Sequence, residues 1–382
     1  MKPRVLLLST VHPPTDPRIM YKIAPSLATD YAVICVLPKL ERAMGKKDFE
    51  TISLPFFRNL LLRILLCHPV LLWRCLRFRP AIVHIFVPEL IPIAFLFHWL
   101  GAKVIYEVQE NLYKKFSIKQ FNKAVVFQLL FKFFDRAARK KFYCLFTEHA
   151  YLNEYKNLPL TSAVVHNYVA LPFIDRYYGK HEKQITKPPV FFYCGVISME
   201  RSFDVLVAAL IRLKSRHPDF RMHMFGKLQF DIMDAEKLPG FFKIQSNIVF
   251  HGYTDLKNAL PFARGATAGI ALLKPVADYT DSYTTKIFEY MAMQLPVITS
   301  DFPLYRDVVE NAGCGFCISP YDSDTLAKKL EWLVENPEKA GIMGRKGRIS
   351  TETYYNWANE EKILLNFYTN LLKPKKSYFL TI

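Results

Sequence analysis

The sequence predicts an α/β protein with two domains, each built on a doubly wound parallel sheet. The chain has 382 residues, more than a single hydrophobic core usually holds. Short runs of Val, Ile, Leu and Phe alternate with segments of helical periodicity, as is typical of parallel strands covered on both faces. One polar, Pro-ended segment, 177–189, has the composition of a linker.

The apolar runs place the expected strands in order along the chain. In the first half they lie at 4–10, 31–37, 81–87, 103–108 and 142–148, and in the second half at 190–195, 221–226, 247–253, 267–273 and 295–301. We therefore expect an N-terminal domain at 1–180 and a C-terminal domain at 181–355. Residues 356–382 are expected to form a helix that crosses back to the first domain, followed by a tail.

Charge is distributed unevenly. The net charge is +17; residues 1–190 carry 28 Lys and Arg against 13 Asp and Glu, whereas residues 191–382 carry 23 against 21. This asymmetry indicates that the first half faces a polyanion or an anionic membrane surface. No secretory signal is expected, because the apolar run in "MKPRVLLLSTVHPP" is too short. The most apolar segment, 60–80, is broken by Arg, His and Pro and suits an amphipathic segment better than a membrane-spanning one.

Seven cysteines at irregular positions indicate reduced, mostly buried thiols. The single CxxC, "CGFC" at 314–317, has no second pair for zinc and does not follow an N-terminal strand. We interpret it as a packing feature.

The segment "TDSYTTKIFEYMAMQLPVITSD" (280–301) places Lys286 in the first turn of an expected helix, where a cation opposes the helix dipole. A surface pair with Glu289 at i,i+3 is one explanation. A bound anion is the other, because ligands of parallel sheets collect beyond the strand carboxyl ends. Arg201 repeats the pattern after the strand that ends at Gly195, and two cations at one crevice favour a diphosphate.

Several segments, taken in order, resemble one enzyme family. They are "HPPTDPRIMYKIAPSLA" (12–28), "IVHIFVPELIPIA" (82–94), "KVIYEVQENL" (103–112), "CGVISMERSFDVLVAAL" (194–210) and "TTKIFEYMAMQLPVITSDFP" (284–303). The chain resembles retaining GT-B glycosyltransferases of family 4, in particular bacterial enzymes that build capsule, O-antigen and exopolysaccharide. The resemblance covers nearly the whole chain. It implies the GT-B fold, two Rossmann-like domains facing a central cleft.

The resemblance also implies a site. A nucleotide-sugar donor, with UDP preferred, would lie mainly on the C-terminal domain. The residues implied in donor binding are Gly195, Arg201, Gly226, Tyr253, Asp281, Thr284, Thr285, Lys286, Ile287 and Glu289. Those implied in catalysis are Asp281, Arg201, Lys286 and Gln109, and those of the acceptor-side loop are His12, Asp16 and Arg18. A hexosyltransferase-like enzyme (EC 2.4) would stabilise the departing nucleoside diphosphate electrostatically, without a metal or other cofactor.

Three departures from the family pattern leave a weakly active or inactive homologue open. Val87 and Gln109 stand where Asp and a sugar-contacting His are common, and Val196 replaces an Arg that follows the glycine. Gln can hydrogen-bond but cannot carry charge. His84, within a strand, is expected to be a core histidine, whereas His12 lies in a strand-end loop.

The basic stretch 113–142 is either a core-facing helix with a solvated basic face or a surface that docks on an anionic leaflet. Docking would suit a polyprenyl-diphosphate-linked saccharide acceptor, and a cytoplasmic enzyme held peripherally at the inner face of the plasma membrane. Nucleic-acid binding is not expected, because no zinc-finger, RRM or helix-turn-helix pattern is present. A non-catalytic scaffold homologue and a non-hydrolysing epimerase remain alternatives, although no acid/base carboxylates for the epimerase can be located.

Overall fold

The computed structural model describes residues 2–39, 48–115, 125–179 and 188–373. The chain forms two compact units, Met1–Asn167 with Ala358–Ile382, and Tyr168–Trp357. The first change of unit precedes the segment expected as a linker, of which residues 180–187 lie outside the described residues. The last helix, α15 (Trp357–Leu372), belongs to the first unit except for its first residue.

The first unit contains a seven-stranded sheet with the order β3-β2-β1-β4-β5-β6-β7. All its neighbouring strands pair in parallel. The strands are β1 (Arg4–Leu8), β2 (Ala32–Pro38), β3 (Glu50–Leu54), β4 (Ile82–Ile85), β5 (Lys103–Val108), β6 (Tyr143–Phe146) and β7 (Ser162–Val164).

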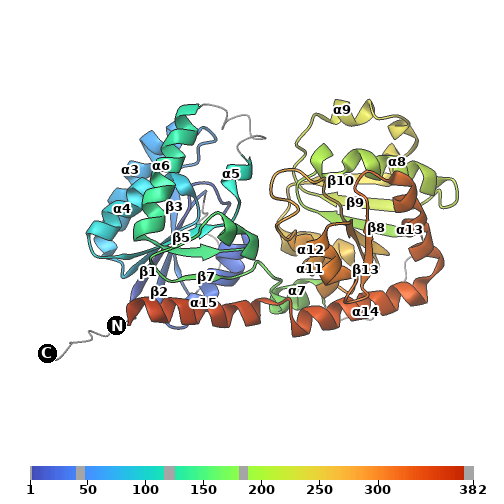
Figure 1. Cartoon of the computed structure of the whole chain (residues 1–382). Coiled ribbons are helices and arrows are strands. Elements are labelled where there is room, and N and C mark those ends of the chain that lie inside the picture. Colours follow the sequence, from blue (N-terminus) through green and yellow to red (C-terminus); the bar gives the residue numbers. More distant parts are fainter. Residues whose placement is uncertain (1, 40–47, 116–124, 180–187, 374–382) are drawn as a thin grey trace. The chain divides into compact units, whose positions relative to one another are not determined.

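Helices cover both faces of this sheet (Figure 1). They are α1 (Ala24–Ala28), preceded by the π-helix η1 (Ile19–Ile23), α2 (Leu60–Leu62), the π-helix η2 (Arg63–Cys67), α3 (His68–Cys75), α4 (Ile91–Trp99), α5 (Leu112–Lys115), α6 (Val125–Lys141) and α15. Leu71 of α3, Phe97 of α4 and Ala138 of α6 pack with strand residues such as Val83 in one core. Successive strand side chains alternate, so His84 points to the other face, where its Nδ1 lies 2.6 Å from Tyr368 Oη of α15.

The second unit contains a six-stranded sheet with the order β10-β9-β8-β11-β12-β13, and its neighbouring strands are also parallel. The strands are β8 (Val190–Cys194), β9 (Arg221–Phe225), β10 (Ile248–Gly252), β11 (Ala268–Ala271), β12 (Val297–Ser300) and β13 (Gly315–Ile318). This order, three strands to one side of a switch point and three to the other, is that of the dinucleotide-binding Rossmann fold.

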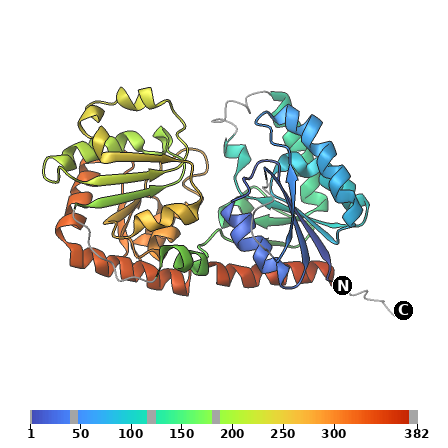
Figure 2. The ribbon, with the colours of Figure 1, turned by 180° about the vertical axis from the view of Figure 1, so that it is seen from behind.

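Its helices also cover both faces (Figure 2). They are α7 (Leu171–Tyr178), α8 (Phe203–Lys214), α9 (Ile232–Glu236), α10 (Leu256–Ala259), α11 (Thr285–Ala292), α12 (Pro303–Val309), α13 (Ser323–Glu335) and α14 (Pro337–Thr353). Leu206 of α8 and Leu330 of α13 share a core with Phe191, whereas Ile287 of α11 and Tyr305 of α12 pack on the opposite face. The predicted doubly wound α/β fold is confirmed in both halves.

All seven cysteines are free thiols, as expected. Burial raises the pKa of Cys314 and of Cys317 to about 12. Cys317 lies within β13, and Cys314 directly precedes that strand, so the "CGFC" segment serves packing at a sheet edge. Among the described residues no helix combines the length and the apolar character needed to cross a bilayer.

Candidate functional site

The carboxyl edge of the second sheet brings three strand-end glycines together. Gly195 donates its N–H to Phe225 O at 2.7 Å, and Gly226 donates to Gly252 O at 2.8 Å. A Cβ on Gly226 would lie 1.8 Å from Gly195 O, and its φ is +141°, so no side chain fits there. The turns that follow β8, β9 and β10 are therefore in direct contact.

Lys286 lies beside this edge in the first turn of α11, whose N-cap residue is Thr284. Its side chain is only 3 % exposed. Nζ lies 5.1 Å from the centroid of the Tyr193 ring, and a Cβ on Gly195 would be 3.1 Å from it. Within the described residues, Nζ has no hydrogen bond and no ion pair. Burial, and then the charge of Arg201, lower the pKa of Lys286 well below its ordinary value.

Arg201 supplies a second cation at the same place. It ends the 3₁₀ helix η7 (Met199–Arg201), directly before α8, and its Cζ lies 5.8 Å from the Tyr279 ring centroid. Its charge acts both on Lys286 and on Tyr193, the ring that Lys286 Nζ faces. Two cations and the N-terminus of α11 thus converge on one small region, which is suited to an anion that carries more than one charge.

The surface pair of Lys286 with Glu289 is not what the structure shows, because Lys286 is buried and Nζ makes no ion pair with the described residues. Glu289 is half-buried one turn further along α11, and its charge opposes the lowering of the Lys286 pKa. Asp281 is half-buried in the loop before the helix, where its N–H donates to Asp278 O at 3.0 Å.

The other predicted donor residues differ in exposure. Thr285 is the first residue of α11 and is half-buried, like Thr284. Tyr253, which follows Gly252, is 66 % exposed. Ile287 is fully buried and packs in the core, and its backbone N–H donates to Thr284 O at 3.2 Å.

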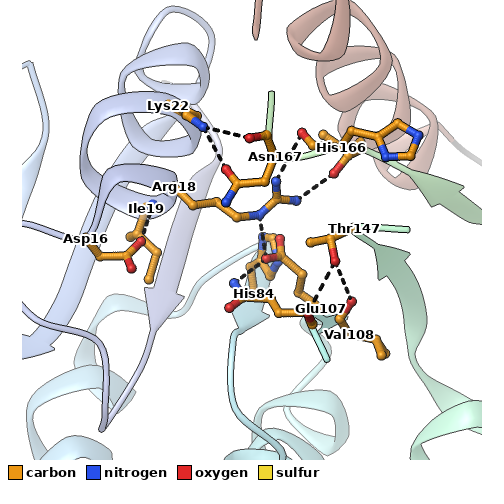
Figure 3. Close-up of polar contacts among 12 residues, drawn as sticks. Asp16, Arg18, Ile19, Lys22, His84, Glu107, Val108, Thr147, His166 and Asn167 are labelled. Atoms are coloured by element: carbon orange, nitrogen blue, oxygen red, sulfur yellow. Dashed lines mark hydrogen bonds and ion pairs between the residues drawn. The ribbon is translucent and has the colours of Figure 1, made fainter. Parts of the chain in front are cut away.

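In the first unit, Glu107 at the end of β5 is the centre of a buried polar network (Figure 3). Its Oε1 accepts from Arg18 Nε at 2.8 Å and from Gln109 Nε2 at 2.6 Å, and His84 Nε2 lies 3.1 Å from Oε2. Burial alone would raise the pKa of Glu107, but Arg18 and then His84 overcome it and lower that pKa to about 2. Arg18 also donates to the carbonyl of Val165 at 2.9 Å.

This network fixes the orientation of Gln109 and the tautomer of His12. Because the ionised Glu107 only accepts, Gln109 must turn its amide nitrogen toward it and its oxygen toward His12. His12 Nε2 lies 3.1 Å from that oxygen and so carries the proton, while Nδ1, at 2.8 Å from Ser9 Oγ, accepts. Both polar groups of Gln109 are thus engaged within the first unit.

The remaining residues of the predicted acceptor-side loop hold the local structure. Asp16 Oδ1 accepts at 2.9 Å from the N–H of Ile19, the first residue of η1. Lys22, at the end of η1, donates to Asn167 Oδ1 at 2.7 Å (Figure 3). Arg18 is only 3 % exposed. Val87, the other departure noted in this half, is buried in the core.

Comparisons with known proteins agree with this architecture. Residues 179–350, which include Arg201 and Lys286, match the family model of glycosyl transferases group 1. A segment of 163 residues is 23 % identical to EpsD of Bacillus subtilis (strain 168), a protein to which glycosyltransferase activity is ascribed. That match covers 42 % of this chain and 40 % of EpsD, so the chain spans about two fifths of the length of this relative.

Solved structures match over almost the whole chain. Sucrose-phosphate synthase from Thermosynechococcus elongatus has a TM-score of 0.76 at 14 % identity, covering 97 % of this chain and 99 % of its own. A glycosyltransferase from Rickettsia africae ESF-5 has a TM-score of 0.69 at 18 % identity, covering 97 % and 99 %. HepE of Anabaena, in complex with UDP and glucose, has a TM-score of 0.67 at 13 % identity, covering 96 % and 100 %. The chain has the GT-B fold, as the resemblance implied.

Proposed function

We propose that this chain is a retaining glycosyltransferase of family 4 that transfers a sugar from a UDP-sugar to a lipid-linked saccharide in the synthesis of surface polysaccharide. The observation that carries the proposal is Lys286, a cation 3 % exposed beside Arg201, whose Nζ has no anionic partner among the described residues. A buried charge is costly unless it is paired, so the missing partner is expected to be a ligand. The match to glycosyl transferases group 1 and the UDP held by HepE support a nucleotide sugar.

In this proposal the donor diphosphate lies against Gly195, where the lack of a Cβ leaves room beside Lys286 Nζ. Lys286, Arg201 and the free N–H groups at the start of α11 would neutralise it. The same groups stabilise the charge that develops on the departing UDP, and their burial strengthens this effect. As the resemblance implies, Glu289 would accept from the ribose hydroxyls, Asp281 would hold the transferred sugar and Tyr253 would meet the base.

The second candidate is a protein that binds a nucleotide sugar without transferring it. It is favoured by Gln109, whose amide is engaged by Glu107 and His12 and carries no charge. Turnover of isotope-labelled UDP-sugars in the presence of membrane lipid extract separates the two candidates, because only the transferase moves label into the lipid fraction.

Binding of UDP by calorimetry tests the donor site. Lys286→Met should weaken UDP binding about 10- to 100-fold, because a hydrogen bond to a charged group contributes roughly 1.5–3 kcal/mol. Lys237→Met removes the same charge from an exposed side chain of the same unit and should leave the Kd unchanged. The proposal fails if the wild-type protein binds no nucleoside diphosphate, or if Lys286→Met binds UDP as tightly as wild type.

The proposed lipid-linked acceptor is supported by the outer surface of helix α6. Val126, Leu129, Leu130 and Phe133 follow the spacing i, i+3, i+4, i+7, which normally marks the face of a helix that packs on a core. Here all four are between 48 % and 66 % exposed, while Ala138 of the same helix is buried in the core. The helix therefore presents a second apolar face to its surroundings. Residues 116–124 of the predicted basic stretch lie outside the described residues.

Cations flank this apolar face. A cavity of about 940 Å³ between α4 and α6 is lined by Phe95, His98, Trp99, Leu129, Lys132, Phe133, Arg136, Ala137, Lys140 and Lys141. Trp99 is 74 % exposed and Trp73 of α3, on the same face of the sheet, is 78 % exposed. Exposed aromatic residues beside Lys and Arg suit the headgroup region of an anionic leaflet, where each cation contributes roughly 1 kcal/mol. We propose that this surface holds the protein peripherally at the inner face of the plasma membrane.

Co-sedimentation with vesicles tests the docking surface. The protein should bind phosphatidylcholine vesicles that contain phosphatidylglycerol, bind pure phosphatidylcholine less, and dissociate as salt is raised. Phe133→Asp should reduce binding several-fold, whereas Phe242→Asp, at a 76 % exposed position of the second unit, should not. Equal binding to both vesicle types, or equal loss in both variants, would contradict docking through α6.

A further inference from the structure

A second cavity lies at the opposite edge of the second sheet from Lys286. Its volume is about 510 Å³, and its lining includes Pro189, His217 and Thr267 together with the end of α13. Pro189 directly precedes β8, Thr267 directly precedes β11, and His217 leads into β9. The cavity is therefore at the amino edge of the sheet, whereas the proposed donor site is at the carboxyl edge.

Three side chains with metal-binding chemistry meet at this edge. His217, Glu331 and Glu335 each place one possible ligand atom within 4.8 Å of the other two. Glu331 and Glu335 are one turn apart on α13, so they share a helix face. His217 follows α8, where its N–H donates to Leu213 O at 3.0 Å and fixes the backbone. His217 and Glu335 also line the cavity.

The imidazole of His217 gives a second, independent observation. Its Nε2 is buried and has no hydrogen-bond partner in the part of the chain that the structure describes. A buried polar atom left unpaired destabilises the fold, and such atoms are rare unless a water or an ion satisfies them. An imidazole and two carboxylates are ligands that Zn²⁺ accepts, with a water in the fourth position.

We propose that His217, Glu331 and Glu335 bind a divalent cation of the zinc type. Bonds of about 2.0–2.2 Å to a tetrahedral ion place ligand atoms roughly 3–4 Å apart, so the present spacing needs only a small closure around the ion. Arg216 Nη1 forms an ion pair with Glu331 Oε1 at 2.8 Å, so the second oxygen of that carboxylate can bind the metal. Such a hydrogen bond from outside the ligand set orients a ligating carboxylate.

The cation ties the end of α8 to α13, the two helices that share one face of the sheet. The role of the cation is structural, because the cluster lies at the sheet edge opposite Lys286. This proposal does not depend on the proposed transferase activity. Sequence spacing gives no sign of this site, because His217, which follows α8, and Glu331 of α13 lie far apart in the chain.

Calorimetric titration of the full, untagged and chelator-treated chain with ZnCl₂ tests this site. One Zn²⁺ per chain should bind and raise the thermal midpoint, while Mg²⁺, which prefers oxygen ligands, should bind far more weakly. Glu335→Gln, at an exposed position that tolerates substitution, and His217→Ala should each weaken Zn²⁺ binding at least 10-fold. Glu338→Gln, an exposed carboxylate at the start of α14, is the matched control and should bind as wild type.

No Zn²⁺ binding at micromolar concentration would overturn the proposal. Binding that survives in both His217→Ala and Glu335→Gln would also overturn it, because it would assign the metal to other groups, such as the free thiols. Circular dichroism of each apo variant shows whether the fold is kept, and Glu335→Gln decides the matter if His217→Ala does not fold.

Discussion

Arg18 in the first unit and Lys286 in the second are equally buried, at 3 % exposure each, but their surroundings differ. Arg18 pairs with Glu107 and donates to the carbonyl of Val165, so its charge is neutralised inside the protein. Lys286 Nζ has no hydrogen-bond or ion-pair partner among the described residues and has a second cation, Arg201, nearby. A buried cation with its counterion in place supports a structure, whereas one without a counterion indicates a site for an incoming anion.

The largest expected effect follows from removing the satisfied cation. Arg18→Met leaves Glu107 buried without its main counter-charge, so the free energy of unfolding should fall by about 3–5 kcal/mol. Arg212→Met breaks the exposed pair with Asp324 and should cost at most about 1 kcal/mol. Urea unfolding of both variants measures the difference, and equal losses would remove the structural distinction between Arg18 and a surface arginine.

A smaller effect on stability, of opposite sign, is expected from replacing Lys286, the buried cation without a counterion in the described part of the chain. Lys286→Met replaces a buried ammonium with an apolar side chain of similar shape, so in the absence of nucleotide the thermal midpoint should stay the same or rise. Lys237→Met, at an exposed position, should leave the midpoint unchanged. If Lys286→Met lowers the midpoint as Arg18→Met does, Lys286 has a partner in the free protein and the comparison fails.

The same substitution should remove a pH dependence. Because the pKa of Lys286 is lowered in the folded chain, the unfolded chain binds more protons between that pKa and the ordinary value of 10.5. Wild-type stability should therefore rise with pH across this window, while UDP binding, which needs the ammonium form, weakens. Glu107 acts at the acidic end of the pH scale. Its contribution to the free energy of unfolding is lost as the pH falls from 4.5, the ordinary pKa of a glutamate, toward the lowered pKa of about 2. Identical alkaline profiles for wild type and Lys286→Met would contradict the role given to Lys286.

The strands show what the sequence could and could not predict. Each of the ten expected runs overlaps a strand, because strands inside a parallel sheet are buried on both faces and their sequences are continuous apolar stretches. The strands that were missed, β3, β7 and β13, all lie at sheet edges. Most of their residues are only half-buried, so the apolar run is interrupted by residues such as Glu50, Thr51 and Ser162.

The candidate site shows the same limit. Lys286 and Arg201 could be predicted because each places a cation at the start of a helix, where the helix dipole disfavours positive charge. A few residues of sequence are enough to recognise this pattern. The network around Glu107 could not, since Arg18 and His84 reach it from different strands and loops, and the spacing of these residues carries no periodic signal. The placement of Gln109 was similarly hidden, because its neighbours His12 and Glu107 come from two separate strand ends.

Helix α15 has a consequence for how the chain is made. Tyr368 on this helix meets His84, and Glu360 accepts from the backbone of His166 at 2.6 Å, so the first unit is completed by the last helix. On the ribosome, residues 1–167 emerge first but must wait for the whole second unit to be translated before these contacts can form. A nascent chain released early would keep the polar centre of its first unit uncovered, and would be a ready target for chaperones and proteases.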